Sequence, residues 1–521
     1  MPALRLALNQ IDTTFGDLPG NADLVVRWTR HAADQGAQLV AFPDATLIGS
    51  PAEAQQPRPW LLDASRSALV QLAERLESEG LGGTPVVLGC VEGRGDGPAS
   101  RPALLHQGHV LTRPATHGPV VVRLHGVDVA LGVGGDLQQD GKWLHALSGA
   151  GLLLVTGAFP YATGGGDARL ERVRDRARAA GCAVACVNLT GGQDERVFDG
   201  DSLVVDAKGE VLARAPQFEE GCLLADLDLP PATSGPDGPG DHHVVISEEA
   251  APAPAEPVAA GRARRMDELE EVYAALVCGV RAQTAKNGFT SILVGLDGGI
   301  GSALVAAVAV DAIGAEDVHG VTLPTSETSG QALENAAETA RRTGLVLRSV
   351  PLDPVLDACT DALDLTDLAD LNLQARLCGT VLAALAETEG RLLLATSDRT
   401  GLTIGHPSVH GQAMGAFAPL RHVYRTTALR LAKWRNAAAA ARGEVPPVPE
   451  RTLTDADDQP GAEPLPPYEV LDALLTAYVD EGAGESELVG RGFPPETVAR
   501  VTRLADAAAS TRHRHPPGTR L

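Results

Sequence analysis

The chain has 521 residues, which is enough for two or more domains with substantial cores. Its formal net charge of −24 argues against nucleic acid and anionic membranes as main partners, since both are negatively charged. No apolar run approaches the roughly 20 residues of a membrane span, and the N-terminus lacks the layout of a signal peptide. The seven cysteines are scattered and odd in number, which favours reduced thiols in the cytoplasm over a disulfide framework.

Residues 1–230 alternate predicted strands and helices. Apolar or alternating runs predict strands at residues 4–11, 39–43, 85–91, 103–112, 120–133, 152–157 and 183–189. Helical periodicity marks residues 21–35, 65–78 and 167–181. Residues 197–215 have the pattern of a hairpin, with Asp206–Gly209 as its turn. Cys182 and Cys186 are four residues apart, and we interpret them as part of a buried strand rather than as a redox or metal pair.

Residues 231–264 are rich in Pro, Gly, Ala, Asp and Glu, and we expect them to form a linker without regular elements. His242 and His243 lie within it, and metal binding by this pair is the less favoured interpretation. From residue 265 the βα pattern resumes. Strands are expected at residues 291–296, 318–323, 346–351 and 391–396, and helices at 266–287, from 300, and at 331–343, 371–389, 468–480 and 494–510. This order predicts a doubly wound parallel sheet with a nucleotide at the C-terminal ends of the strands.

The segment S-I-L-V-G-L-D-G-G-I-G-S at residues 291–302 has the layout of a phosphate loop. A strand leads through a glycine turn into a helix, so that backbone N–H groups and the helix N-terminus point at the phosphates. Asp297 places a negative charge in this loop. Two like charges about 4 Å apart repel by about 4 kcal/mol at an effective dielectric constant near 20. The loop therefore has the backbone of a phosphate site and an unfavourable side chain.

Four segments carry a resemblance to a known family: L-R-L-A-L-N-Q-I-D-T-T-F-G-D-L-P-G-N-A-D at 4–23, G-G-Q-D-E-R-V-F-D-G-D-S at 191–202, W-R-N at 434–436 and L-P-P-Y-E-V-L-D at 465–472. With them, the chain resembles the glutamine-dependent NAD synthetases over nearly its whole length. The resemblance implies an α-β-β-α nitrilase-like sandwich over 1–230. It also implies a doubly wound ATP-pyrophosphatase-type domain with a helical C-terminal tail over 265–521.

The resemblance implies that a glutaminase site would need a cysteine nucleophile, a glutamate and a lysine. Asp44 stands at the glutamate position of the Phe-Pro-Glu segment, and its carboxylate is retracted by on the order of 1 Å, one bond length. Gly134 stands at the nucleophile position. No lysine occurs before Lys142, and the lysine loop of the family is shortened to residues 111–118. We therefore expect no glutaminase activity.

In the second site, Gly295, Gly298, Gly299 and Ser302 keep the phosphate loop of the related synthetases. Asp297 replaces a hydroxyl residue. Gly301 and Gly401 replace carboxylates that would bind magnesium, and Arg399 replaces a lysine; a glycine side chain supplies no ligand oxygen. The family's Gly-Asp segment becomes Gly411–Gln412, and its substrate loop is replaced by the short acidic segment Thr452–Pro464. Three polar residues of a substrate helix remain: Asn372, Gln374 and Arg376.

These changes favour a non-catalytic structural or regulatory subunit that needs no cofactor. The alternative is an ATP-dependent amide ligase that forms NAD from deamido-NAD with glutamine or ammonia, with ATP and magnesium as cofactors. The resemblance also implies an oligomer, either of identical chains or with an intact NAD synthetase. His406 and His410 have i, i+4 spacing, but Pro407 argues against the helix that a metal pair would need.

Overall fold

The computed structural model describes residues 3–50, 58–94, 97–111, 119–232, 242–250, 257–259, 261–363, 367–405, 411, 413–454, 465–512 and 514–521. The chain divides into two compact units, Met1–Glu271 and Val272–Leu521, which we call the N-terminal and C-terminal units. Within the described part of the chain, no helix has both the length and the apolar character needed to cross a membrane.

The N-terminal unit contains two β-sheets. The first has the strand order β14-β1-β2-β3-β4-β5, in which β1 pairs antiparallel with β14 and parallel with β2. Its strands are β1 (Ala3–Gln10), β2 (Leu39–Ala41), β3 (Val86–Arg94), β4 (Gly97–His106), β5 (His109–Val110) and β14 (Gly221–Asp228). The alternation of apolar and polar residues in β1 places Leu4, Leu6 and Leu8 on one face of this sheet, because side chains along a strand point to opposite sides in turn.

The second sheet has the strand order β13-β12-β9-β8-β7-β6-β15. Its strands are β6 (Val120–Leu124), β7 (Val127–Val133), β8 (Leu152–Thr156), β9 (Ala183–Val187), β12 (Leu203–Val205), β13 (Val211–Arg214) and β15 (His242–Val245). Strands β12 and β13 form the predicted hairpin. In its turn, the Asp206 carboxylate accepts hydrogen bonds from the backbone N–H groups of Lys208 and Glu210. A separate hairpin joins β10 (Thr190–Gln193) to β11 (Arg196–Asp199).

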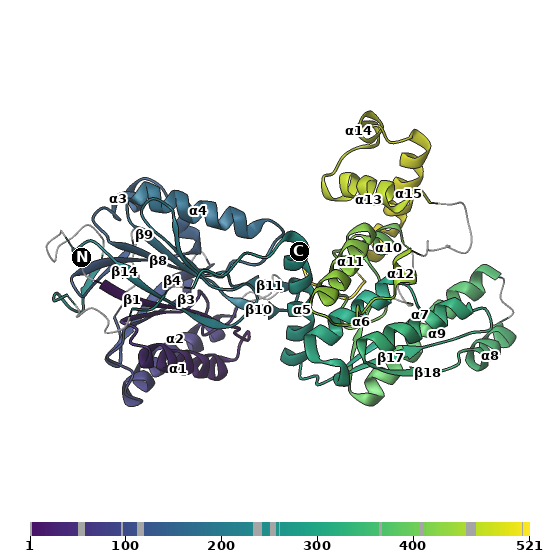
Figure 1. The fold of residues 1–521 in the computed structure, drawn as a ribbon, viewed down its shortest axis with the longest axis horizontal. Coiled ribbons are helices and arrows are strands. Elements are labelled where there is room, and N and C mark those ends of the chain that lie inside the picture. Colours follow the sequence, from purple (N-terminus) through teal and green to yellow (C-terminus); the bar gives the residue numbers. More distant parts are fainter. Residues whose placement is uncertain are drawn as a thin grey trace. The chain divides into compact units, whose positions relative to one another are not determined.

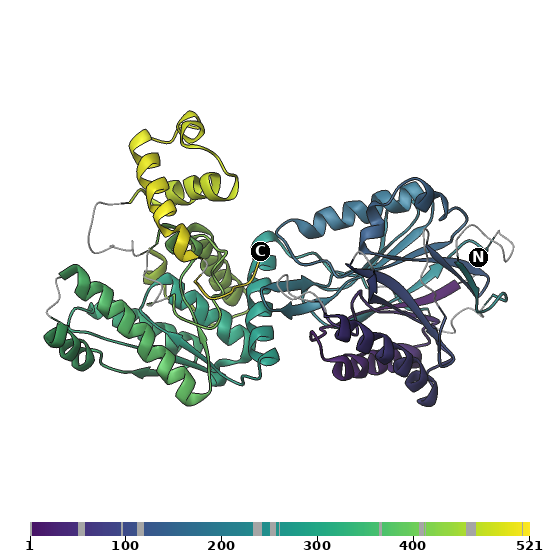
Figure 2. The ribbon, with the colours of Figure 1, turned by 180° about the vertical axis from the view of Figure 1, so that it is seen from behind.

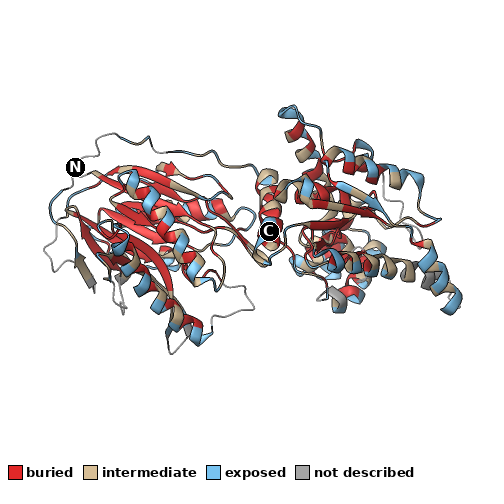
Figure 3. Ribbon diagram, turned by 90° about the horizontal axis from the view of Figure 1, so that it is seen from below, coloured by how far each residue is buried: buried red, intermediate tan, exposed pale blue. Residues whose placement is uncertain are grey.

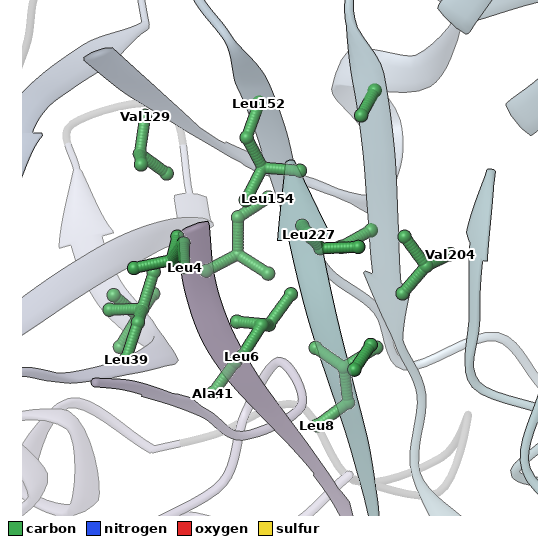
Figure 4. Close-up of a cluster of buried hydrophobic side chains, with 14 of the residues drawn as sticks. Leu4, Leu6, Leu8, Leu39, Ala41, Val129, Leu152, Leu154, Val204 and Leu227 are labelled. Carbon is green, nitrogen blue, oxygen red and sulfur yellow. The ribbon is translucent and has the colours of Figure 1, made fainter. Parts of the chain in front are cut away.

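The two sheets pack face to face around a core of Leu, Val and Ala side chains (Figure 4). On the other face of the first sheet lie α1 (Leu18–Asp34) and α2 (Pro59–Ser78), and on that of the second lie α3 (Lys142–His145) and α4 (Gly165–Ala180) (Figures 1 and 2). Helix α1 begins at an Asp17 cap, whose side chain accepts the Gly20 N–H. The predicted α-β-β-α sandwich is confirmed.

Strand β15 lies in the segment that the composition indicates to be a linker without regular elements. It pairs in parallel with β6, with His243 opposite Val121 and Val244 opposite Val122. A buried ion pair lies beneath it, in which the Arg123 guanidinium donates two hydrogen bonds to Asp128, at 2.9 and 3.0 Å. Part of the segment is thus an edge strand of the second sheet.

The C-terminal unit contains a four-stranded parallel sheet of order β18-β17-β16-β19. Its strands are β16 (Ile292–Gly295), β17 (Val318–Thr322), β18 (Val346–Ser349) and β19 (Leu392–Leu394). The surrounding helices are α5 (Glu268–Lys286, whose first residues belong to the N-terminal unit), α6 (Ile300–Ile313), α7 (Gly330–Thr343), α8 (Asp353–Leu363), α9 (Asp367–Glu389) and α11 (Arg425–Ala441). Figure 3 shows that the central strands are buried. The predicted parallel sheet is confirmed.

Helix α10 (Arg399–Ile404) and the end of the chain form a helical group with its own core, in which the other elements are α13 (Tyr468–Leu475), a π-helical turn η3 (Thr476–Asp480), α14 (Glu485–Gly490) and α15 (Pro495–Arg512). The short helix α12 (Glu450–Thr454) contacts α6 and α11. Beyond α15 the chain returns to α5. Thr519 is fully buried, and its hydroxyl lies where a Cβ on Gly279 of α5 would be. The Pro517 carbonyl accepts the Ala418 N–H at 2.8 Å.

Candidate functional site

Asp44 follows β2, and hydrogen bonds with the backbone fix its position. Its N–H donates to the Gly157 carbonyl at 3.0 Å, and its carboxylate accepts the Ala45 N–H at 2.7 Å. Burial raises the pKa of Asp44 to about 6, although hydrogen bonds from Ser100 and Ala45 act in the opposite direction and the charge of Asp136 adds to the increase. A buried carboxyl group of this kind is a candidate for proton transfer near neutral pH.

Gly134 follows β7 and begins the 3-10 turn η1 (Gly134–Gln138). A Cβ atom at Gly134 would lie 2.8 Å from Cζ and 2.9 Å from Cε1 of Phe159, closer than real Cβ atoms approach other atoms. A Cβ at Gly157 would lie 2.5 Å from Cε2 of the same ring. The Phe159 ring therefore fills the space in front of the position where a nucleophile would stand.

The backbone of Phe159 is fixed by Asn188. The Asn188 side-chain oxygen accepts the Phe159 N–H at 2.8 Å, and its amide group donates to the Phe159 carbonyl at 3.3 Å. The Arg169 guanidinium carbon lies 6.0 Å from the ring centroid. Sequence reasoning did not single out Phe159 or Asn188. The only signal was the Gly157-Ala158-Phe159 run at the end of a predicted strand, where family sites carry functional groups.

Three buried cysteines of the N-terminal unit are poor substitutes for the missing nucleophile. Burial raises the pKa of Cys90 to about 12, of Cys182 to about 11 and of Cys186 to about 12, so these thiols are neutral at pH 7. Cys186 lies in β9 and Cys182 directly precedes it. Both belong to the core between β9 and α4, as the strand interpretation predicts. The loop of residues 112–118, where the lysine is missing, lies outside the described residues.

In the C-terminal unit, the loop between β16 and α6 has the predicted strand-turn-helix form. Gly298 has φ of +84°, and a Cβ there would overlap the Ala332 carbonyl oxygen, so that only glycine fits. The Asp297 carboxylate turns back onto the loop. Its Oδ1 accepts the Gly299 N–H at 2.9 Å and also the Ser302 hydroxyl. The Gly299 N–H and the Ser302 hydroxyl, which could both donate to an anion, thus donate to a side chain of the loop itself.

Gly301 lies in the first turn of α6. A Cβ there would be 2.6 Å from the Thr396 carbonyl oxygen, so a carboxylate cannot be placed at this position without a backbone shift. Gly401 lies in α10, where its N–H donates to the cap residue Asp398 at 2.9 Å. Across the described residues, no three His, Cys, Asp or Glu side chains gather as they would around a metal ion. Residues 406–410, which include His406 and His410, and Gln412 lie outside the described part.

The segment after β19 is tied into the helical group. Thr400 donates to the Asp472 carboxylate at 2.6 Å, and the same carboxylate accepts the Thr426 N–H at 2.8 Å. Arg399, at the lysine position, forms an ion pair with Asp480 and lies 5.1 Å from the Tyr424 ring centroid. Arg399 therefore interacts with residues that pack around α10.

A cavity of about 200 Å³ opens at the C-terminal ends of β16, β17 and β19. Asp297 and Gly295 border it, together with Gln374, which donates to Thr325 at 3.2 Å. Most of its wall is apolar: Leu296, Val321, Leu323, Leu333, Leu382 and Met414. The sequence predicted a nucleotide at these strand ends. The resemblance also placed Gln374 of α9 on a substrate helix, whereas the other wall residues of α7 and α9, among them Leu333 and Leu382, were not predicted.

Comparison with known proteins agrees with this architecture. A family model for NAD synthase matches residues 272–516, and one for carbon-nitrogen hydrolase matches residues 108–236. The glutamine-dependent NAD(+) synthetase of Rhodobacter capsulatus is 31 % identical, with 99 % of this chain and 95 % of the relative covered. That of Acinetobacter baylyi is 30 % identical, with 100 % and 96 % covered. The chain belongs to the glutamine-dependent NAD(+) synthetase family.

Solved structures of the family support the fold. The glutamine-dependent NAD+ synthetase from Acinetobacter baumannii, in complex with adenosine diphosphate, has a TM-score of 0.74 at 29 % identity and covers 100 % of this chain and 96 % of that one. The enzyme from Cytophaga hutchinsonii has a TM-score of 0.79 at 16 % identity, covering 99 % and 95 %. Within this glutamine-dependent NAD synthetase fold, Gly134 and Gly157 lie against the Phe159 ring, and Asp297 accepts hydrogen bonds at the start of α6.

Proposed function

We propose that this protein is a non-catalytic member of its family that acts as a structural or regulatory subunit. The observation that carries the proposal is the pair formed by Gly134 and Phe159. The first provides no nucleophile, and the ring of the second lies where a side chain at Gly134 would begin. Asp44 keeps a buried carboxyl group, but covalent catalysis of amide cleavage also needs a nucleophilic side chain.

The second site supports the same proposal. Asp297 engages the Gly299 N–H and the Ser302 hydroxyl, and adds a negative charge where pyrophosphate would be bound. Magnesium would offset that charge, but Gly301 and Gly401 supply no ligand oxygen and Gly301 has no room for a larger side chain. At both sites, the side chains that the resemblance assigns to the chemistry are therefore replaced.

The comparisons favour a second candidate function. Relatives of about the same length, at about 30 % identity, are glutamine-dependent NAD(+) synthetases. The cavity beside the loop also has the location at which doubly wound sheets bind nucleotides. This candidate is an ATP-dependent ligase, with magnesium, that forms NAD from deamido-NAD with glutamine or ammonia as nitrogen donor.

One pair of assays separates the two candidates. Purified protein is incubated with ATP, magnesium and deamido-NAD, with either ammonium or glutamine, and AMP, NAD and glutamate are measured. We expect no product above a heat-denatured blank with either donor. Formation of NAD with either donor would establish the second candidate, and release of glutamate would overturn the argument from Gly134.

The single variant Gly134→Cys is expected to remain inactive towards glutamine, because the new side chain meets the Phe159 ring and the lysine is still absent. The variant Gly134→Cys with Phe159→Ala makes room for the thiol. It tests whether the steric obstruction alone prevents thiol reactivity, measured by alkylation with iodoacetamide. A fast reaction of Cys in the single variant would show that the ring does not obstruct the position.

We further propose that the subunit assembles, either with itself or with an intact NAD synthetase. Supporting this, large apolar side chains are exposed along the edge strand β18 and the adjacent helix α8: Val346 is 53 %, Val355 44 % and Leu363 58 % exposed. Light scattering across a range of concentrations is expected to give a mass above the 53.9 kDa of one chain. A constant monomer mass, together with no synthetase recovered with the protein from its native cell, would contradict this proposal.

A further inference from the structure

Helix α5 ends in a turn that leads into β16. Gly288 has φ of +76°, the left-handed conformation in which helices commonly end at a glycine. Its N–H donates to the Ala285 carbonyl at 3.2 Å, and the Phe289 N–H donates to the Thr284 carbonyl at 3.0 Å. These two hydrogen bonds form a Schellman motif, in which Asn287 is the last residue before the left-handed glycine.

The peptide bond between Asn287 and Gly288 lies at the surface. Both residues are exposed, and the Asn287 side-chain amide donates to the Gln283 carbonyl at 2.8 Å. Apart from Gly288 and its two neighbours in the chain, no atom of the described residues lies within 4 Å of the position that a Cβ on Gly288 would take. Water therefore reaches this peptide bond, and no packed side chain holds it in place.

An asparagine that precedes a glycine can react with its own backbone. The Gly288 nitrogen, once hydroxide has removed its proton, forms a bond to Cγ of Asn287. The bond from Cγ to the amide nitrogen breaks, and ammonia leaves after taking a proton from water. Glycine favours this step, because it has no Cβ to shield its nitrogen or to restrict its backbone. Water then opens the resulting succinimide ring at one of its two carbonyls, which gives aspartate or isoaspartate.

The other asparagines of the chain do not combine these features. The chain has seven asparagines, and only Asn287 is followed by glycine. Asn372 precedes a leucine, and its side chain lies outside the described residues. The remaining five are buried: Asn9, Asn21, Asn188, Asn335 and Asn436. Sequence and exposure therefore single out the same residue.

We propose that Asn287 is a site of spontaneous covalent modification, at which deamidation through a succinimide loosens the turn between α5 and β16. In isoaspartate the main chain passes through the side-chain carbons, so it gains one methylene just before Gly288. This shift displaces the two N–H donors of the Schellman motif. Both products also place a negative charge at the C-terminal end of α5, where the helix dipole disfavours it. The inference does not depend on the proposed function.

The test is peptide mapping of the full chain after incubation at mildly alkaline pH. Digestion in water enriched in oxygen-18 marks any deamidation that occurs during the digest itself. Asn287 is expected to convert into aspartate and isoaspartate, while the other asparagines stay unchanged over the same period. A synthetic peptide of residues 281–292 gives the rate without the fold, and it is expected to react faster, because the turn engages the Gly288 nitrogen. No conversion in the folded chain by the time the peptide has fully reacted, or earlier conversion at another asparagine, overturns the proposal.

Two variants test the effect on the turn, which is measured by hydrogen–deuterium exchange of residues 284–295. Asn287→Gln keeps an amide but would need a larger, less favourable ring, so it is expected neither to react nor to change on incubation. In the wild-type chain, exchange is expected to become faster after incubation, because the hydrogen bonds of the turn are lost. An equal increase in Asn287→Gln would place the change elsewhere and overturn the role of Asn287. Freshly prepared Asn287→Asp carries the charge without the longer backbone, and it is expected to show a smaller increase. An increase as large as that of the incubated wild type would overturn the role of the lengthened backbone.

Discussion

Replacing Arg169 with alanine is expected to lower the free energy of unfolding of the N-terminal unit by about 3–5 kcal/mol. The guanidinium group is only 4 % exposed and donates to Asp199 at 2.6 Å and to Asp201 at 3.0 Å, both fully buried. Without it, two buried carboxylates remain close to each other, and only Arg214 is left to pair with Asp201. Denaturant unfolding followed by tryptophan fluorescence measures the loss.

All variants in this measurement also carry Trp434→Phe. The other three tryptophans, at positions 28, 60 and 143, all lie in the N-terminal unit, so the fluorescence then reports on that unit alone. The control is Arg66→Ala. Arg66 pairs with Asp63 at 3.4 Å, and their side chains are 58 % and 73 % exposed, so the expected effect is below about 1 kcal/mol. Adding Asp199→Asn to Arg169→Ala should recover part of the loss. A loss below about 1 kcal/mol for Arg169→Ala would contradict the prediction.

Replacing Asp44 with asparagine is expected to stabilise the N-terminal unit by about 3 kcal/mol at pH 7.5 and to have little effect at pH 4. Burial raises the pKa of this carboxyl group from its ordinary value of 3.8 to about 6 in the folded protein. The folded state therefore binds the proton more tightly than the unfolded state. The stabilisation of the fold by the protonated Asp44 carboxyl group is fully present below about pH 4 and is lost as the pH rises through 6.

Asparagine stays neutral over this whole range, and its side-chain oxygen can still accept the Ala45 N–H. The measured quantity is the difference in unfolding free energy between variant and wild type at several pH values. Asp63→Asn, which changes a side chain that is 73 % exposed, is expected to give a difference near zero at every pH. A difference for Asp44→Asn that does not depend on pH would show that folding does not raise the pKa of this carboxyl group.

Much of the fold follows from local patterns in the sequence. The alternation in β1 and the continuous apolar run of β8 predict their strands, and the Asp206–Gly209 turn predicts the β12–β13 hairpin. Helix α11 was not predicted, because its run of alanines at 437–441 has little contrast between its faces. Strand β15 was not predicted, because its pairing with β6 depends on residues about 120 positions away.

The sequence pattern put Asp44 and Gly134 directly after predicted strands, and Asp297 and Gly301 in the turn and helix start after a third strand. It did not predict what surrounds these residues. The contact of Gly134 with Phe159, and of Gly301 with Thr396, depends on tertiary packing between separate segments. A carboxylate restored at Gly301 looks harmless in the sequence, but the structure leaves no space for it.

The return of the chain from α15 to α5 has a consequence for how this protein is made. Thr519 leaves the ribosome 240 positions after Gly279, the residue whose helix it covers. At common rates of translation this is an interval of roughly ten to fifty seconds. During that time strands β1 and β14 of the N-terminal unit can already have paired, while the side of α5 that Thr519 later contacts is still exposed. Newly made chains should therefore depend on chaperones mainly through their second half, and ribosome profiling of chaperone binding would detect this.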